Sequence, residues 1–181
     1  MRIAVIGTGF IGGILGRALA RSGHDVTFGS RHPDDREVAG DTNADVVILA
    51  LPGAAVSELT AAHAGALERA LVVDATNRMG ETVSNSRAAL PSTSRYARAF
   101  NTLGGENMED PVFGDGPADL FFSAPSADRA TVEAVIEGVG LRPIYLGEDQ
   151  EALVDALFQV WIALAMRQGW GRRLALRVIR D

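Results

Sequence analysis

A short apolar run opens the chain and passes directly into a glycine-rich turn. Residues 2–6 (RIAVI) have the composition of a buried strand, and the chain continues as Gly7-Thr8-Gly9-Phe10-Ile11-Gly12. From Phe10 to Ser22, apolar residues recur at helical spacing, and Gly23 then favours the end of the helix. A strand that turns tightly into a helix is the first half of a strand–helix–strand unit, whose two strands run parallel. This feature therefore favours a parallel sheet with crossover helices.

The rest of the chain continues this alternation. Further strands are expected at 25–29, 44–51, 71–75, 96–100, 119–123 and 143–146, and further helices at 54–70 and 127–138. The order predicts an α/β fold, a doubly wound parallel sheet of the Rossmann type with helices on both faces. The connection 31–45 contains Pro, Gly, Asn and several Asp, so the usual crossover helix there is expected to be lost or reduced to a turn.

A chain of 181 residues fits one domain. We assign residues 1–147 to the Rossmann part and 148–181 to C-terminal helices that pack on the sheet or on a second copy of the chain. In this tail, apolar residues recur at helical spacing, and a second helical piece is expected at 172–180. The apolar positions are Leu153, Leu157, Val160, Trp161 and Leu164. Because a monomer would expose part of this face, a homodimer is expected.

Composition excludes several classes of chemistry. The chain has no Cys and no Lys, which removes thiol catalysis, Schiff bases and lysine acids or bases, and with three His no metal site is expected. A net charge of −6 without a basic tract argues against nucleic-acid binding. No apolar run is long enough to span a membrane and the N-terminus does not resemble a signal peptide, so a cytoplasmic protein is expected. An enzyme of this composition needs carboxylates, hydroxyls, amides, Arg or a bound cofactor.

The glycine pattern matches G-x-G-x-x-G in the strand-to-helix context that dinucleotide binding requires. Gly7 permits the tight turn, Gly9 lets the backbone approach a pyrophosphate, and Gly12 lets the helix pack closely on the strand. The helix that begins within this hexapeptide has a positive N-terminal end, which attracts the negatively charged pyrophosphate. The alternative is a glycine turn with a purely structural role.

The end of the second expected strand indicates which dinucleotide is bound. NAD sites place a carboxylate there for the ribose hydroxyls, but this strand ends in Gly29-Ser30-Arg31. A hydroxyl at Ser30 and a guanidinium at Arg31 suit the 2′-phosphate of NADP. The alternative for Arg31 is a solvated surface charge.

Several motifs together resemble one family. The segments are IAVIGTGFIGGILGRALARSGHDVTFGSR at 3–31, VVILALP at 46–52, VVDATN at 72–77 and RAFNTLG at 98–104. The chain resembles the NADP oxidoreductases that reduce the deazaflavin coenzyme F420, and it is similar to the reductase domain of eukaryotic membrane metalloreductases. The resemblance implies direct hydride transfer between nicotinamide and deazaflavin, with a protein that binds, orients and excludes water.

The resemblance also implies further cofactor-binding residues. Leu51 and Pro52 would border the adenosine and phosphates, Thr76 and Asn77 the nicotinamide ribose and ring, and Asn101 and Thr102 the reacting edge. For the asparagines, the alternative is a role in local turns. The chain departs from the family at Phe10, where a polar residue is usual, and at Arg78, where Pro is common.

Two functions follow from these observations. The first is an NADP(H)-dependent oxidoreductase that transfers hydride between the nicotinamide and a second cofactor or small-molecule acceptor, with F420 as a possible co-substrate. The second is a non-catalytic NADP-binding protein that senses redox state or supports a partner. No catalytic residue is singled out by the sequence.

Overall fold

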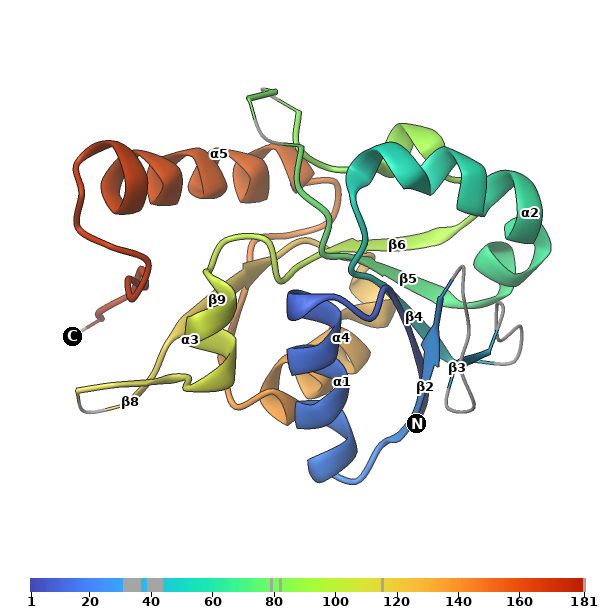
Figure 1. Ribbon diagram of the computed structural model, residues 1–181, viewed down its shortest axis with the longest axis horizontal. Coiled ribbons are helices and arrows are strands. Elements are labelled where there is room, and N and C mark those ends of the chain that lie inside the picture. The colour runs from blue at the N-terminus through green and yellow to red at the C-terminus, as the bar shows by residue number, and fades with distance from the viewer. Residues whose placement is uncertain (31–36, 39–43, 79, 82, 115, 181) are drawn as a thin grey trace.

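A six-stranded parallel sheet forms the centre of the computed structural model, which describes all residues except 31–36, 39–43, 79, 82, 115 and 181 (Figure 1). Its strand order is β3-β2-β1-β4-β5-β6. The strands are β1 (Arg2–Ile6), β2 (Asp25–Gly29), β3 (Glu37–Val38), β4 (Val46–Leu49), β5 (Leu71–Asp74) and β6 (Arg95–Arg98). The predicted α/β fold with a doubly wound parallel sheet is thus confirmed. Apart from β3, the connection 31–45 lies largely outside the described residues, so its expected lack of a helix stays a prediction.

Two further strands continue the sheet beyond β6. Strand β9 (Asp119–Phe122) pairs in parallel with β10 (Arg142–Tyr145). An antiparallel bridge between Arg98 and Ser123 joins this pair to the end of β6, through two backbone hydrogen bonds of 2.8 and 3.1 Å. The end of β6 is therefore connected both to the main sheet and to the C-terminal part of the chain.

Helices cover the two faces of the sheet because the buried strands present apolar side chains alternately to each side. Ile3 and Val5 belong to a core shared with α1 and α4, whereas Ala4 packs into a second core under α2. Figure 1 shows α1 and α4 on one side of the sheet and α2 on the other. The bounds are α1 (Phe10–Arg21), η1 (Gly53–Ala55), α2 (Val56–Arg69), η2 (Arg87–Ala89), α3 (Gly105–Glu109), η3 (Ser126–Asp128) and α4 (Arg129–Gly138). The short pair β7 (Val112–Phe113) and β8 (Gly116–Pro117) follows α3.

The C-terminal block begins with the helix α5 (Glu151–Ile162), which continues as a π-helical turn (Ala163–Arg167). Its buried face carries Val154, Asp155, Phe158 and Trp161. The remaining apolar positions form an outward stripe, in which Leu153 and Val160 are exposed and Leu157 and Leu164 are partly exposed. Among the described residues, no helix is long and apolar enough to cross a membrane.

The second helical piece predicted at 172–180 is wrong, because this segment is irregular. Side chains from elsewhere bind its main-chain carbonyls and so replace helical hydrogen bonds. The Asn107 amide donates to the carbonyls of Arg172 and Leu174, both at 2.9 Å, and Trp161 Nε1 also donates to that of Leu174. Arg142 donates to the carbonyl of Val178. The tail therefore lies along α3 and β9 as an extended segment (Figure 1).

Candidate dinucleotide site

The three glycines of the N-terminal turn have different physical requirements. Gly7 has a φ of +109°, and a Cβ there would lie 2.3 Å from the Ala50 carbonyl oxygen. A Cβ on Gly12 would lie 1.8 Å from the Gly7 oxygen. Gly9 has an ordinary φ of −69°, and a Cβ there would meet no atom within 4 Å. The fold therefore requires Gly7 and Gly12, whereas Gly9 leaves open space beside the backbone that a ligand can use.

The N-terminus of α1 has the properties of an anion site. Gly9 is its N-cap residue and offers no side-chain cap, and no acidic residue lies in the first turn. The first N–H groups of a helix have no partner within the helix, and the helix dipole adds positive potential there. An uncapped end beside Gly9 therefore suits a phosphate group.

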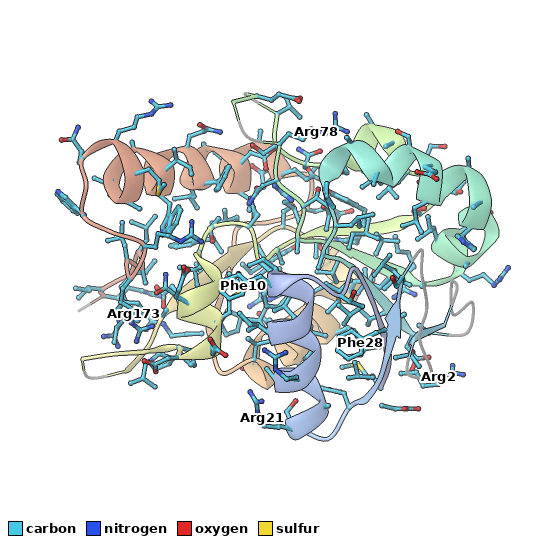
Figure 2. All side chains as sticks on the ribbon, in the orientation of Figure 1. Arg2, Phe10, Arg21, Phe28, Arg78 and Arg173 are labelled. Carbon is cyan, nitrogen blue, oxygen red and sulfur yellow. The ribbon has the colours of Figure 1, made fainter. Side chains whose placement is uncertain are left out.

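Phe10 connects this turn to the start of α3. Its side chain is 58% exposed, and its ring lies against Gly105, where a Cβ would be 2.4 Å from the ring. Figure 2 shows Phe10 at the N-terminal end of α1, on the side that faces α3. Ile11 makes a similar contact with Gly105, and Thr8 is exposed beside the turn.

The residues expected near the adenosine are only partly described. Ser30 is half-buried at the end of β2, and Arg31 lies outside the described residues. Leu51 is half-buried and Pro52 exposed after β4. A Cβ on Gly12 would lie 3.3 Å from the Cβ of Ala50, the residue before Leu51. The end of β4 therefore packs against the glycine turn.

The ends of β5 and β6 bring Asn77 and Asn101 together. The Asn77 Nδ2 donates to the main-chain carbonyl of Asn101 at 3.3 Å. Thr76 precedes Asn77 and is buried, with its hydroxyl 2.7 Å from that of Ser86. The structure thus places the residues expected at the nicotinamide end side by side, while the Thr76 hydroxyl is engaged within the protein.

Asn101 and Thr102 carry buried polar groups without hydrogen-bond partners. Asn101 is 1% exposed, and neither its Nδ2 nor its Oδ1 is hydrogen-bonded; the same holds for the Thr102 hydroxyl. The preceding residue, Phe100, has a φ of +62°, in the left-handed region that non-glycine residues rarely adopt. Each unpaired buried group costs about 1–3 kcal/mol, and strained backbone of this kind clusters at functional sites. Together these features make the segment after β6 a candidate ligand site.

The sequence analysis did not identify the buried charge cluster beneath this edge. Arg98 is fully buried, and its guanidinium lies 3.5 Å from an Asp74 oxygen and 2.9 Å from an Asp155 oxygen. Tyr96 donates to Asp74 Oδ2 at 2.8 Å. Burial, followed by the charge of Asp74, raises the pKa of the Tyr96 hydroxyl well above its usual value. Asp74 and Arg98 lie within the DATN and RAFNT motifs, so the sequence could have indicated two members of this cluster. Neither motif reveals the third charged member, Asp155.

A cavity of about 630 Å³ lies between α5 and the segment around residue 85. None of the glycine-turn residues line it. Its lining residues are Val83, Asn85, Arg87, Asp149, Glu151, Ala152, Asp155, Ala156 and Gln159. Among the described residues, no group of three or more His, Asp or Glu side chains could hold a metal ion.

A known protein family matches the part of the chain that contains the glycine turn. Residues 2–78 match the family described as NADP oxidoreductase, coenzyme F420-dependent. The family resemblance is confirmed. The matched stretch contains the glycine turn, β2, β4 and the DATN motif. No curated protein sequence matches the chain.

Solved structures extend the likeness to the whole chain. A candidate F420-dependent NADP-reductase from Arthrobacter sp. FB24 is 26% identical, with a TM-score of 0.81, over 99% of this chain and 100% of that one. A hypothetical protein from Sinorhizobium meliloti is 24% identical, with a TM-score of 0.68, over 100% and 96%. An imine reductase from Streptomyces aurantiacus is 21% identical, with a TM-score of 0.71, over 94% of this chain and 64% of the reductase. The last two likenesses show the fold alone.

Proposed function

We propose that the protein is an NADP(H)-dependent oxidoreductase that passes hydride between the nicotinamide and a second cofactor or small acceptor, with the deazaflavin F420 as the first candidate. The observation that carries this proposal is the open space at Gly9 beside the uncapped N-terminus of α1. Two glycines of the motif are explained by packing within the protein, whereas the absence of a side chain at Gly9 leaves the space that a ligand needs to approach the backbone.

The residues at the strand ends fit NADP. The glycine turn would bind the pyrophosphate, Ser30 and Arg31 the 2′-phosphate, and Leu51 and Pro52 the adenosine side. At the other end, the unpartnered amide of Asn101 and hydroxyl of Thr102 provide both donors and acceptors for the polar groups of a nicotinamide riboside. Thr76 and Asn77 border the same end.

The protein's own contribution to hydride transfer is positioning. NADPH, when bound, supplies the hydride. Asn101 and Thr102 would orient the nicotinamide end through hydrogen bonds, which replace the ones that their buried atoms lack. Phe10 packs against Gly105, which follows Thr102 closely in the sequence, and would limit the access of water to this end. A protein that positions the cofactor and leaves the chemistry to it needs neither Lys nor Cys, and the chain has neither.

Binding preference tests the cofactor. NADPH should bind more tightly than NADH, because the sequence has Ser30 and Arg31 directly after β2, at the position where NAD sites have a carboxylate. A charge-assisted phosphate contact is worth about 1.5–3 kcal/mol, so Arg31→Ala should weaken NADPH binding about ten- to a hundredfold and leave NADH binding unchanged. Arg21→Ala, at the exposed end of α1, makes the same change of charge and serves as the control in fluorescence titrations. Equal affinities of the wild type for NADPH and NADH would contradict the assignment.

An acceptor screen tests the enzyme activity. Purified protein with NADPH is assayed against F420, a flavin, a ferric chelate, a quinone and a cyclic imine by loss of NADPH absorbance. Reduction of any of these supports the oxidoreductase and identifies its acceptor class. Tight NADPH binding without reduction of any acceptor would favour the non-catalytic redox sensor instead.

The outward stripe of α5 supports a homodimer as part of the same proposal. Leu153 is 52% exposed and Val160 45% exposed, and Leu157 and Leu164 continue the stripe at helical spacing. A second copy of the same helix, related by a two-fold axis, would cover these side chains with matching apolar ones. The pairing would place the helix of one copy near the acceptor side of the other.

A further inference from the structure

Arg98 uses its whole guanidinium group to bind atoms around the nicotinamide end of the proposed site. Its Nη1 donates to the main-chain carbonyls of Asp74 at 3.1 Å and Thr76 at 2.6 Å. Its Nη2 donates to Asn77 Oδ1 at 3.1 Å, and its Nε donates to Asp155 Oδ1 at 2.9 Å. One fully buried side chain therefore fixes both the main chain of the loop after β5 and the side chain of Asn77.

These contacts decide how the Asn77 amide is oriented. Its Oδ1 accepts from Arg98, so its Nδ2 points to the other side, where it donates to the carbonyl of Asn101. The half-buried Asn77 therefore connects the ends of β5 and β6. Without the donor from Arg98, the amide would lose its fixed orientation and the ends of the two strands would lose a connection.

Asp155 extends the cluster from the sheet to α5. Its Oδ2 accepts from the main-chain N–H groups of Ser84 and Asn85 at 3.0 and 3.2 Å and from Asn85 Nδ2 at 2.7 Å. Its Oδ1 binds Arg98. A carboxylate with this many donors is held firmly in place, so it fixes the position of α5 relative to Arg98.

We propose that Arg98 is the positioning residue of the nicotinamide end: it orients Asn77 and, through Asp155, couples the position of α5 to the loop that contacts the dinucleotide. This inference rests on the proposed function. The role requires arginine, because the planar guanidinium donates in several directions at once, whereas the ammonium of lysine cannot reach Thr76, Asn77 and Asp155 together.

Strand β6 offers a matched control. Arg95 lies at the opposite end of the same strand and binds Asp128 through Nε at 3.1 Å and through Nη2. This ion pair lies at the other end of β6 from the contacts of Arg98. Arg95→Lys therefore makes the same chemical change on the same strand without touching the loop after β5.

Two ligands separate a positioning role from a merely structural one. NADPH spans the whole site, whereas 2′,5′-ADP contains only its adenosine half. We expect Arg98→Lys to weaken NADPH binding about three- to tenfold, the range of one lost hydrogen bond, and to leave 2′,5′-ADP binding unchanged. Arg95→Lys should change neither affinity. Asn77→Ala should reproduce the selective loss, and the double variant Arg98→Lys with Asn77→Ala should lose no more than either single variant, because both act on the same contact.

The outcomes are distinguishable by titration calorimetry on folded proteins. A selective loss of NADPH affinity in both single variants supports the proposal. Unchanged NADPH affinity, or an equal loss for both ligands, overturns it. If Arg98→Lys does not fold, Asn77→Ala decides alone. Unchanged NADPH affinity in that variant refutes the proposal that Arg98 acts on the nicotinamide end through Asn77. A wild type that binds neither ligand would instead refute the proposed function, and the inference with it.

Discussion

Gly9 and Gly12 give the sharpest test of whether the turn binds a ligand, because the same substitution should have opposite consequences at the two positions. In Gly9→Ala, the new Cβ meets no atom within 4 Å and the φ of −69° is compatible with alanine. Loss of glycine flexibility in the unfolded chain stabilises by about 0.4–1 kcal/mol, and the poorer N-cap offsets much of this. For a chain of this length, the melting temperature should change by less than about 3 °C.

Gly12→Ala should instead destabilise the fold. Its Cβ would lie 1.8 Å from the Gly7 carbonyl oxygen and 2.9 Å from the Gly7 carbonyl carbon, so α1 must move away from the turn. Overpacking against a rigid backbone costs about 1–3 kcal/mol and sometimes more. At about 2–4 °C for each kcal/mol, the melting temperature should fall by roughly 6–12 °C when the cost is near 3 kcal/mol.

The assay combines thermal unfolding with NADPH titration for both variants. Gly9→Ala should unfold at the wild-type temperature but bind NADPH at least about tenfold more weakly, a loss of about 1.4 kcal/mol, because the methyl group lies where the pyrophosphate approaches the backbone. Gly9→Val should abolish binding with the fold still intact. Wild-type NADPH affinity in folded Gly9→Ala would refute the ligand explanation of Gly9 and leave the turn with a structural role.

Two further predictions concern stability at high pH and assembly. Folding raises the pKa of the Tyr96 hydroxyl above its unfolded value near 10.0, so the free energy of unfolding should be constant below pH 10 and decrease as the pH rises further. Urea unfolding should show this decrease in the wild type but not in Tyr96→Phe. The substitution itself should cost about 1.5–3 kcal/mol of stability, because the hydrogen bond to Asp74 is lost. A pH-independent stability of the wild type above pH 10 would contradict the burial of this hydroxyl. The double variant Leu153→Glu with Val160→Glu should sediment as a monomer at micromolar concentration, whereas Val112→Glu, an exposed apolar site on β7, should not change the assembly. A wild-type monomer would refute the homodimer.

Local patterns were sufficient to predict five of the six strands of the main sheet, whereas the two-residue strand β3 was not expected. The apolar runs at β1, β4 and β5 are buried on both faces, and the glycine turn fixes how β1 enters α1, so few parallel topologies remain. The same patterns located the ends of β5 and β6, where Asn77 and Asn101 meet. Motifs that follow parallel strands lie at one edge of the sheet, and for this reason sequence order alone could place them together.

Long-range polar contacts could not be predicted in the same way. Arginine is usually exposed, and nothing near Arg98 in the sequence reveals a carboxylate partner 57 residues away on α5. The helix predicted at 172–180 was wrong for a related reason. Its apolar spacing favours a helix, but the Asn107 amide, 65 residues from Arg172, binds the main-chain carbonyls that such a helix would use. In both places the conformation depends on a partner that is distant in sequence.

The antiparallel bridge between Arg98 and Ser123 has a consequence for how the C-terminal block acts on the sheet. The Ser123 hydroxyl donates to the carbonyl of Gly147 at 3.0 Å and accepts from the N–H of Gln150 at 2.9 Å, so α5 starts directly beside the end of β6. The start of the C-terminal block is therefore held against the end of β6 through Ser123, while its tail contacts α3 and β9 separately. A shift of α5 relative to the sheet would therefore reach Arg98, and with it the segment before Asn101, directly through the main chain of Ser123.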